Sequence, residues 1–306
     1  MMKKNKITQF IRLSRPIFLI AGVGLYFLGA GIAKYLGNRI DWGVFILGLL
    51  WVLLAQLAAL YLNEYFDEPV DRENESRTVF SGGSGVLGKE EGKLNRKVAL
   101  SGFVVASSLA VALTLSMLWD QSLNLVSGLL MILIYVGGLL YSLPPIQLIR
   151  AGYGEFIAAV IGGYLVPMLS FYLQSGEVHR LVVMASLPIV LLLVVFMLAV
   201  SFPDYATDLK YGKRTFLVRA GWENVVFLHN TLILLAFLVL AAMFYLNFPR
   251  AILFPAFLTF PLGALEFWQM RLIAAGGKPN WKVLTGNAAA LVGSLIYIFS
   301  YFFWTR

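Results

Sequence analysis

The stretch WGVFILGLLWVLLAQLAALYLNEYFDEPVD, Trp42–Asp71, joins a long apolar run to an acidic end. Its first part, Trp42–Leu62, carries no charged side chain and has the length, about 20 residues, that a helix needs to cross a bilayer. The polar part, Asn63–Asp71, follows directly. The stretch therefore predicts a membrane-spanning helix that carries acidic chemistry to one membrane surface.

The composition extends this interpretation to the whole chain. Of the 306 residues, 59% are hydrophobic and 13% are charged, whereas soluble domains have about 45–50% apolar and about 25% charged residues. A water-soluble globule is excluded. We predict an all-α polytopic membrane protein, a single domain over 1–306 with two long functional loops, 63–97 and 203–224. The expected spans number about nine: Ile17–Leu36, Trp42–Leu62, Val98–Leu118, Leu123–Ser142, Gly154–Leu173, Leu181–Phe202, Val225–Leu246, Ala251–Leu272 and Lys282–Trp304.

The basic residues predict how the chain is oriented. Most of the 24 lysines and arginines fall at the N-terminus and in the two long loops, so the positive-inside rule places these in the cytoplasm and the C-terminus outside. We expect an integral protein of a bacterial plasma membrane. The net charge of +8 is explained by loop orientation and anionic lipids, without a nucleic-acid partner. The absence of cysteine excludes disulfides, thiolate metal sites and cysteine nucleophiles.

The acidic end of the first quoted stretch has helical spacing. Asn63, Asp67 and Asp71 recur every fourth residue and would share one face of a continued helix. Such oxygen ligands are those that Mg²⁺ uses when it holds a phosphate. Pro69 opposes the helix at this point, which leaves open whether Asp71 stays on the same helix.

A second acidic stretch closes the sixth predicted span. Asp204 and Asp208 form another i, i+4 pair, and three basic residues follow: Lys210, Lys213 and Arg214. Carboxylates for metal ions and cations for uncovered oxygens together suit a metal-diphosphate. The two stretches also align as a weak internal repeat, with Asn63 matching Asp204, Asp67 matching Asp208 and Arg72 matching Lys213. We predict that both face one site, with the five acidic-stretch ligands Asn63, Asp67, Asp71, Asp204 and Asp208 binding metal.

Further candidates lie in the connecting segments. A glycine-rich turn, Phe80–Gly85, contains Ser81 and Ser84, whose loop could face a diphosphate or an aromatic acceptor. The rigid turn Tyr141–Pro145 could direct the Tyr141 hydroxyl toward the same site. Candidate binding residues are therefore Asn63, Arg72, Arg77, Ser81, Ser84, Tyr141, Tyr205, Lys210, Lys213 and Arg214; Tyr65, Phe66, Tyr141 and Tyr205 are candidates for stabilising a cation.

Four other titratable groups receive simpler interpretations. Glu155 and Glu266 lie in or beside apolar runs, and we interpret them as partners in interfacial or inter-helix hydrogen bonds. His229, like His179, is expected near the outer surface, away from the acidic stretches.

With these motifs, the chain resembles the UbiA superfamily of intramembrane prenyltransferases. The resemblance rests on Asn63, Asp67 and Asp71, on Asp204 and Asp208, and on the Arg15-Pro16 opening; Glu64 departs from the family's usual aspartate. Within the superfamily, Phe80–Ser84, Tyr141–Pro145, Pro203–Tyr205 and Gly212–Thr215 are most similar to the menaquinone-pathway branch.

The resemblance implies a ring of nine helices around a central cavity that is open to the bilayer. It also implies Mg²⁺-dependent transfer of a polyprenyl group from an allylic diphosphate to an aromatic acceptor, 1,4-dihydroxy-2-naphthoate, with Asp67, Asp71, Asp204 and Asp208 as the catalytic residues. The implied partners are thus the polyprenyl diphosphate, the aromatic acceptor and the lipid bilayer.

Alternatives remain at this stage. The same chemistry could serve 4-hydroxybenzoate, homogentisate, haem, chlorophyllide or a glycerol-phosphate lipid. A cation-coupled transporter is disfavoured, because four spans separate the two motifs and put them on one membrane face, whereas an inverted repeat needs an odd offset. A non-catalytic subunit whose acidic loops dock a partner also stays open, and the oligomeric state is not predicted.

Overall fold

The computed structural model describes residues 6–306, and these form helices and connecting loops without a β-strand. In chain order the helices are α1 Lys6–Leu13, α2 Pro16–Tyr35, α3 Trp42–Asp71, α4 Lys97–Trp119, α5 Leu125–Leu140, α6 Gly154–Val160, α7 Val166–Ser175, α8 Arg180–Ser201, α9 Tyr205–Lys210, α10 Phe216–Ala220, α11 Trp222–Met243, α12 Arg250–Ala256, α13 Phe260–Ala274 and α14 Trp281–Thr305. A π-helical turn, Ile161–Leu165, joins α6 to α7, and a 3₁₀ turn, Phe257–Thr259, joins α12 to α13.

The predicted spans are confirmed. In the described residues, 8 helical segments are long and apolar enough to cross a membrane, and the 16-residue α5 occupies the ninth predicted position. Two of the spans are interrupted at prolines. Pro167 cannot donate to Gly163, which lies in the π-helical turn. Pro261 is the second residue after the 3₁₀ turn and cannot donate to Phe257 within it.

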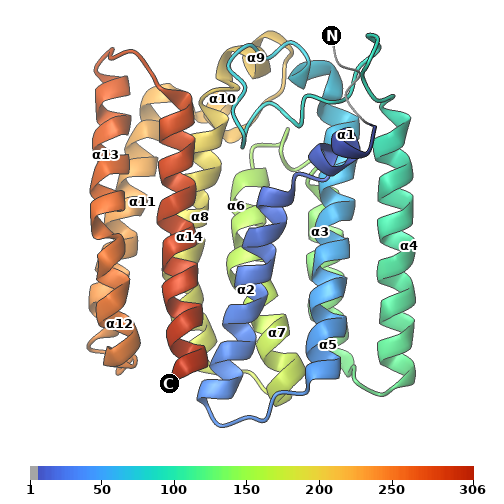
Figure 1. Cartoon of the computed structure of the whole chain (residues 1–306). Helices are drawn as coiled ribbons and strands as arrows, with labels where there is room; N and C mark the ends of the chain where they lie inside the picture. Colours follow the sequence, from blue (N-terminus) through green and yellow to red (C-terminus); the bar gives the residue numbers. More distant parts are fainter. Residues whose placement is uncertain (1–5) are drawn as a thin grey trace.

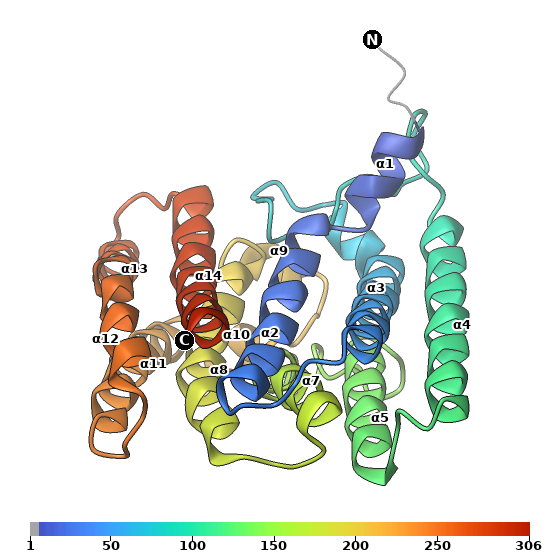
Figure 2. The same cartoon turned by 60° about the horizontal axis from the view of Figure 1, so that its bottom comes forward.

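The long helices run side by side (Figure 1, Figure 2). Residues of α2, α3, α5, α6, α7 and α8 line one central cavity. Helix α8 is the most enclosed of the candidate spanning helices, because 67% of its 18-residue apolar stretch is buried inside the bundle. The same share for α4 is 17%, and α4 lies at the edge of the bundle. Many large apolar side chains point outward, including Ile20, Leu115 and Leu238. An apolar outer surface of this kind is what a bilayer covers.

The connecting segments gather at one end of the bundle, which we call the loop end. The loop 72–96, the short helices α9 and α10, and α1 all lie there, while Arg306 lies at the opposite end (Figure 1). A small apolar cluster anchors the loop: Val86, Leu87 and Leu94 pack with Leu13 and Tyr61. This cluster holds the loop 72–96 over the ends of α2 and α3.

The outer helices α11, α13 and α14 enclose a buried polar cluster. His229 Nε2 lies 3.4 Å from Glu266 Oε1, and Asn287 donates to Glu266 Oε2 at 2.8 Å. The inter-helix hydrogen bond expected of Glu266 is therefore present. The expected surface position of His229 is wrong, because the residue is fully buried two turns inside α11, near the loop end.

Candidate functional site

The first acidic stretch forms a continuous stripe on α3. Helix α3 runs through Pro69 to Asp71, so Asn63, Asp67 and Asp71 all lie on it and line the central cavity. The local break that Pro69 could have caused does not occur, since Arg72 still donates its backbone N–H to Glu68 at 3.0 Å. A proline removes only one helical donor, and the rest of this 30-residue helix is held by packing.

The second acidic stretch is built differently. Helix α8 ends at Ser201, where Pro203 cannot continue it, and the chain turns before the six-residue α9. The backbone N–H of Asp208 donates to the backbone oxygen of Asp204 at 2.8 Å, so the predicted i, i+4 helical spacing of the two residues is present. Asp204 accepts hydrogen bonds from Asn74 at 2.6 Å and from the backbone N–H of Gly82 at 3.3 Å. The loop 72–96 thus fixes the carboxylate of Asp204.

Lys213 joins the two stretches. Its ammonium lies 2.8 Å from Asp67 Oδ2 and 3.9 Å from Asp208 Oδ1. The predicted convergence of both motifs on one place is therefore observed. Burial disfavours the charge on Lys213, but Asp67, Asp208 and Asp71 outweigh it, and the pKa of Lys213 is raised well above its usual value.

For the carboxylates of the second stretch, the effect of burial on the pKa outweighs the effect of the neighbouring charges. Burial raises the pKa of Asp208 to about 7, although the nearby Lys213 acts to lower it. Burial also raises the pKa of Asp204 against the effects of Lys213, the Gly82 N–H and Asn74. Both acids are thus short of positive charge, which a bound cation would supply.

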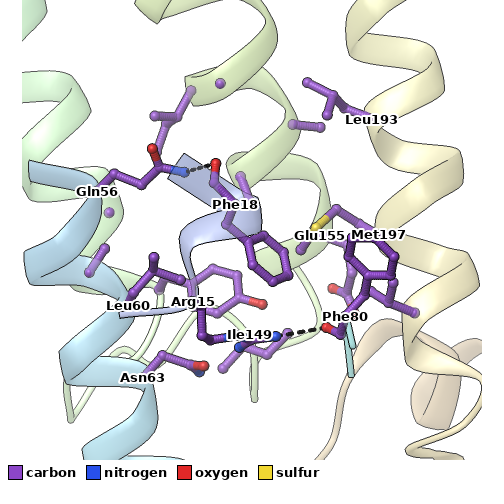
Figure 3. A pocket seen from close by; sticks show the side chains of 18 of the residues that line it. Arg15, Phe18, Gln56, Leu60, Asn63, Phe80, Ile149, Glu155, Leu193 and Met197 are labelled. Atoms are coloured by element: carbon purple, nitrogen blue, oxygen red, sulfur yellow. Dashed lines mark hydrogen bonds between the residues drawn. The ribbon is translucent and has the colours of Figure 1, made fainter. Parts of the chain in front are cut away.

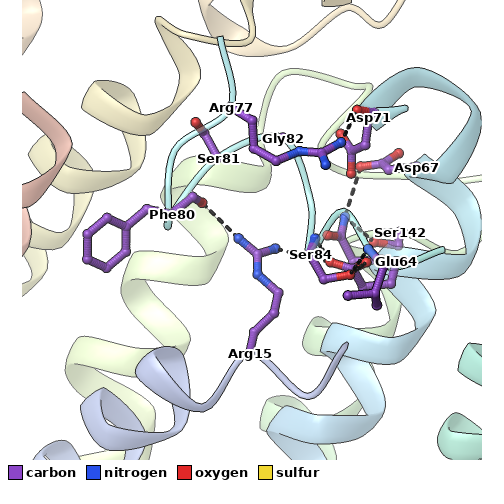
Figure 4. A network of polar contacts seen from close by, with 12 residues as sticks. Arg15, Glu64, Asp67, Asp71, Arg77, Phe80, Ser81, Gly82, Ser84 and Ser142 are labelled. Carbon is purple, nitrogen blue, oxygen red and sulfur yellow. Dashed lines mark hydrogen bonds and ion pairs between the residues drawn. The ribbon is translucent and has the colours of Figure 1, made fainter. Parts of the chain in front are cut away.

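The glycine-rich turn is tied to α3 through Glu64. Both the backbone N–H and the hydroxyl of Ser84 donate to the Glu64 carboxylate, at 2.7 and 2.6 Å (Figure 4). Arg15 approaches Glu64 at 3.8 Å and donates to the backbone oxygen of Phe80 at 2.8 Å. The glutamate that departs from the family pattern therefore holds the turn in place, together with the arginine of the Arg15-Pro16 opening.

Glycine is required in this turn for a steric reason. Gly82 and Gly83 have φ of +71° and +64°, and a Cβ on Gly83 would collide with the Asp71 carboxylate. Because these positions carry no side chain, the backbone can come close to the acidic stripe.

The acids line a central cavity of about 320 Å³ on the side of the loop end, and we call this part of the cavity its mouth. Toward the loop end its lining is polar and includes Lys213 and the acids of both stretches. Deeper in the bundle the lining is mainly apolar, with Leu25, Val52, Ile134, Val166 and Leu193, and Gln56 as a polar exception (Figure 3). A charged mouth above an apolar chamber suits a ligand with an anionic head and an apolar body.

Three aromatic rings meet beside the mouth. Phe80 lies 5.4 Å from Phe196 and 6.0 Å from Phe18, measured between ring centroids, and all three line the cavity. Of the four aromatic residues proposed from the sequence, only Tyr141 lines the cavity. Tyr65 and Phe66 pack edge to face on each other, and Tyr205 packs on Trp222.

The predicted site residues thus fall into two groups. The cavity lining includes Asn63, Asp67, Asp71, Ser81, Tyr141, Asp204, Asp208 and Lys213. The others do not line it: Arg72 pairs with Glu68 and Glu73 on the surface, Arg77 donates to the backbone oxygen of Asp71, Ser84 holds Glu64, Tyr205 packs on Trp222, and Lys210 and Arg214 are exposed.

Sequence reasoning missed Asn74, Glu155, Thr215 and the phenylalanine trio. Asn74 sits in an irregular loop, and nothing local marks it as a partner of Asp204. The only local signal was for Glu155, as an acid at the edge of an apolar run.

Comparisons with known proteins agree with this geometry. The model of the UbiA prenyltransferase family matches residues 23–284. A 1,4-dihydroxy-2-naphthoate octaprenyltransferase from Bacillus subtilis is 24% identical over 260 residues, which cover 85% of this chain and 81% of the relative.

Solved structures share the fold. A digeranylgeranylglyceryl phosphate synthase has a TM-score of 0.64 and 16% identity, covering 98% of this chain and 100% of its own. A UbiA homologue from Archaeoglobus fulgidus, bound to GPP and Mg²⁺, has a TM-score of 0.61 and 17% identity, covering 97% and 100%. Since the family model covers most of the sequence and the fold agrees, the chain belongs to the UbiA prenyltransferase family.

Proposed function

We propose that this prenyltransferase transfers a polyprenyl group from an allylic diphosphate to 1,4-dihydroxy-2-naphthoate, with Mg²⁺, in one catalytic domain. The observation that carries the proposal is the meeting of four acids and Lys213 at the mouth of a mainly apolar cavity: Asp67, Asp71, Asp204 and Asp208. A diphosphate suits the mouth, and a hydrocarbon chain with an aromatic ring suits the interior.

The choice of acceptor rests on sequence similarity. The Bacillus subtilis relative is named for the naphthoate, and its similarity extends over most of both chains. The turns Phe80–Ser84 and Tyr141–Pro145, which resemble the same branch, also contribute lining residues to the cavity. In that reaction the prenyl carbon bonds to the ring, and the ring loses its carboxylate as carbon dioxide.

The residues at the mouth fit Mg²⁺. Asp71 lines the cavity, and its carboxylate accepts no hydrogen bond within residues 6–306. Those residues contain no group of three His, Cys, Asp or Glu side chains that could hold a metal ion by themselves. Mg²⁺ commonly takes one or two carboxylates and completes its shell with water and phosphate oxygens. Asn63, Asp67, Asp71, Asp204 and Asp208 would hold it. Bound Mg²⁺ would neutralise charge on the diphosphate.

The chain's own residues would then stabilise the separating charges. Lys213 is placed to donate to a leaving diphosphate oxygen, where its contribution grows as negative charge develops. The faces of Phe18, Phe80 and Phe196 can stabilise an allylic cation. The apolar walls exclude water, which would otherwise capture that cation.

The membrane arrangement follows from charge and partition. The loop end carries most of the basic residues, so we place it, with α1, in the cytoplasm and the C-terminus outside. A bacterial plasma membrane is the expected location. Each buried methylene of the donor contributes about 0.8 kcal/mol, so a polyprenyl tail would remain in the bilayer while its diphosphate reaches the mouth.

The test is transfer of a radiolabelled polyprenyl diphosphate by the purified chain to a panel of acceptors, with Mg²⁺ or with EDTA. We expect Mg²⁺-dependent product with 1,4-dihydroxy-2-naphthoate. Product with 4-hydroxybenzoate or another acceptor instead would retain prenyl transfer and overturn the choice of acceptor. Equal turnover in EDTA would overturn the role of the metal.

A further inference from the structure

The central cavity contains a second polar site, apart from the acids of its mouth. Glu155, the second residue of α6, is 0% exposed, and Thr215, just before α10, is 3% exposed. Both line the cavity (Figure 3 shows Glu155 among its lining residues). Neither side chain has a role in the binding of Mg²⁺ or of the diphosphate proposed above.

Each side chain keeps an unpartnered oxygen. Glu155 Oε1 accepts the backbone N–H of Phe216 at 3.2 Å, but Glu155 Oε2 and Thr215 Oγ1 have no hydrogen-bond partner within residues 6–306. Leaving such atoms buried and unpaired costs about 1–3 kcal/mol each. Thr215 also occupies the N-cap position of α10, where threonine commonly caps, yet its hydroxyl makes no capping bond. Both oxygens are thus left for a ligand.

Local contacts hold the two residues together. The Glu155–Phe216 hydrogen bond ties α6 to the residue after Thr215, and the Phe156 and Phe216 rings pack edge to face at 4.9 Å. The segment 213–215 is non-helical, with Lys213 and Thr215 buried and Arg214 exposed between them. One short segment therefore supplies both the ammonium at the mouth and the hydroxyl of the second polar site.

The chemistry of the two oxygens selects the ligand. An ionised carboxylate oxygen only accepts hydrogen bonds, whereas a threonine hydroxyl can donate or accept. A phenolic hydroxyl satisfies both, because it donates one hydrogen bond and accepts another. The flat ring that carries it would lie against the apolar cavity wall, close to the prenyl carbon that leaves the diphosphate.

We propose that Glu155 and Thr215 bind a free phenolic hydroxyl of the aromatic acceptor, with Glu155 Oε2 accepting its hydrogen bond and Thr215 Oγ1 donating to its oxygen. This inference rests on the proposed function and adds the groups that recognise the acceptor. The hydrogen bond to Glu155 draws no proton away, but it enriches the ring in electrons and so favours its attack on the allylic cation.

The experiment compares a hydroxyl with its methyl ether in matched variants. The purified full-length chain is supplied with a radiolabelled polyprenyl diphosphate, Mg²⁺ and one of three acceptors: 1,4-dihydroxy-2-naphthoate or either of its monomethyl ethers. The variants are wild type, Glu155→Gln and Thr215→Val. Glutamine has nearly the shape of glutamate and can still accept the Phe216 hydrogen bond, so the fold and any steric penalty of the methyl group are retained.

We expect wild type to lose about 100-fold in kcat/KM with one of the two ethers, as when a hydrogen bond to a charged group is lost. Glu155→Gln should lose about as much with the parent acceptor and less than about 3-fold further with that ether. Thr215→Val should show the same coupling at about 10-fold. The KM for the prenyl donor should stay within about 2-fold throughout, since the mouth is unchanged.

Glu266→Gln and Thr285→Val are the matched controls, because both change fully buried side chains outside the cavity. They should leave the hydroxyl-to-ether ratio at its wild-type value. Equal losses with parent and ethers in Glu155→Gln would overturn the inference, as would a wild type that accepts both ethers as well as the parent.

Failure of the proposed function would look different. Wild type would then make no naphthoate product, and the same comparison would use whichever hydroxylated acceptor it prenylates, together with that acceptor's ether. If wild type prenylates only acceptors without a free hydroxyl, or none, the inference is overturned as well.

Discussion

The two acidic stretches share one sequence pattern but are held by different means. Asp67 and Asp71 belong to a 30-residue helix whose packing continues along its length. Asp204 and Asp208 flank or occupy a helix of 6 residues, far shorter than the ~12–15 residues at which an isolated helix becomes even marginally stable. Asn74 and Gly82, from a distant part of the chain, and Lys213, which follows shortly after Asp208, therefore have to position the second pair.

This difference shows that an i, i+4 spacing predicts direction but not the source of rigidity. The α3 stripe would keep its geometry if a neighbour were lost, because the helix itself supports it. The α9 pair depends on the loop 72–96 and on Lys213. Substitutions can separate these two situations.

The largest effect is expected for Asp67→Ala. Asp67 contacts Lys213, accepts from Asn63 at 2.9 Å and lies 3.8 Å from Arg150, so it is central to the charged mouth. Prenyl transfer should fall by about 1,000-fold or more. The measurement is single-turnover transfer in detergent, with thermal unfolding as the control for the fold. Activity within 10-fold of wild type would contradict the metal role of the α3 stripe.

Lys213→Ala should come next, because within residues 6–306 Lys213 is the only cation that forms ion pairs with both stretches. We expect the KM for the prenyl diphosphate to rise about 10- to 100-fold, the usual consequence of losing a hydrogen bond to a charged group. Donor titrations at saturating acceptor would measure this. An unchanged KM for the donor would show that Lys213 serves to pair the carboxylates and not to hold the diphosphate.

Asn74→Ala tests the dependence of the second pair directly. Its side-chain amide donates to Asp204 at 2.6 Å and has no hydrogen bond to the α3 stripe within residues 6–306. The backbone N–H of Asn74 donates to the backbone oxygen of Asp71 at 3.2 Å, and this bond is retained in the variant. We expect a fall in kcat/KM of about 5- to 10-fold, in line with one lost hydrogen bond of about 1 kcal/mol. Crossing it with Asp204→Ala should give a combined loss no greater than that of Asp204→Ala alone. Additive losses would mean that Asn74 acts elsewhere.

Lys210→Ala should have the smallest effect. Lys210 lies on α9 with Asp208 but is exposed, and its ammonium lies over the Tyr211 ring at 5.3 Å. Surface charges of this kind contribute little, so kcat/KM should change less than about 2-fold at physiological salt. A loss above 10-fold would mean that α9 turns toward the mouth when the diphosphate binds.

Much of the fold could be predicted from particular residues. The uncharged run Trp42–Leu62 requires a spanning helix because lipid cannot satisfy exposed backbone groups, and the apolar runs elsewhere predict the other spans in the same way. His229 is an exception: the sequence predicts a place near the outer surface, but the residue is buried against Glu266 of α13, which also accepts a hydrogen bond from Asn287 of α14. Nothing within a few residues of His229 indicates those partners.

The site, like the fold, could be predicted only in part from the sequence. The spacing of Asn63, Asp67 and Asp71, and of Asp204 and Asp208, was enough to predict two oxygen-rich stretches on one membrane face, because helical periodicity is a local property. Only the tertiary structure decided that Lys213 turns into the mouth while Arg214 turns out. It also brought Glu155 to Phe216, the residue after Thr215, and Asn74 to Asp204. These pairings join residues far apart in the chain, and they depend on how the loops fold over the bundle, which no local pattern of residues encodes.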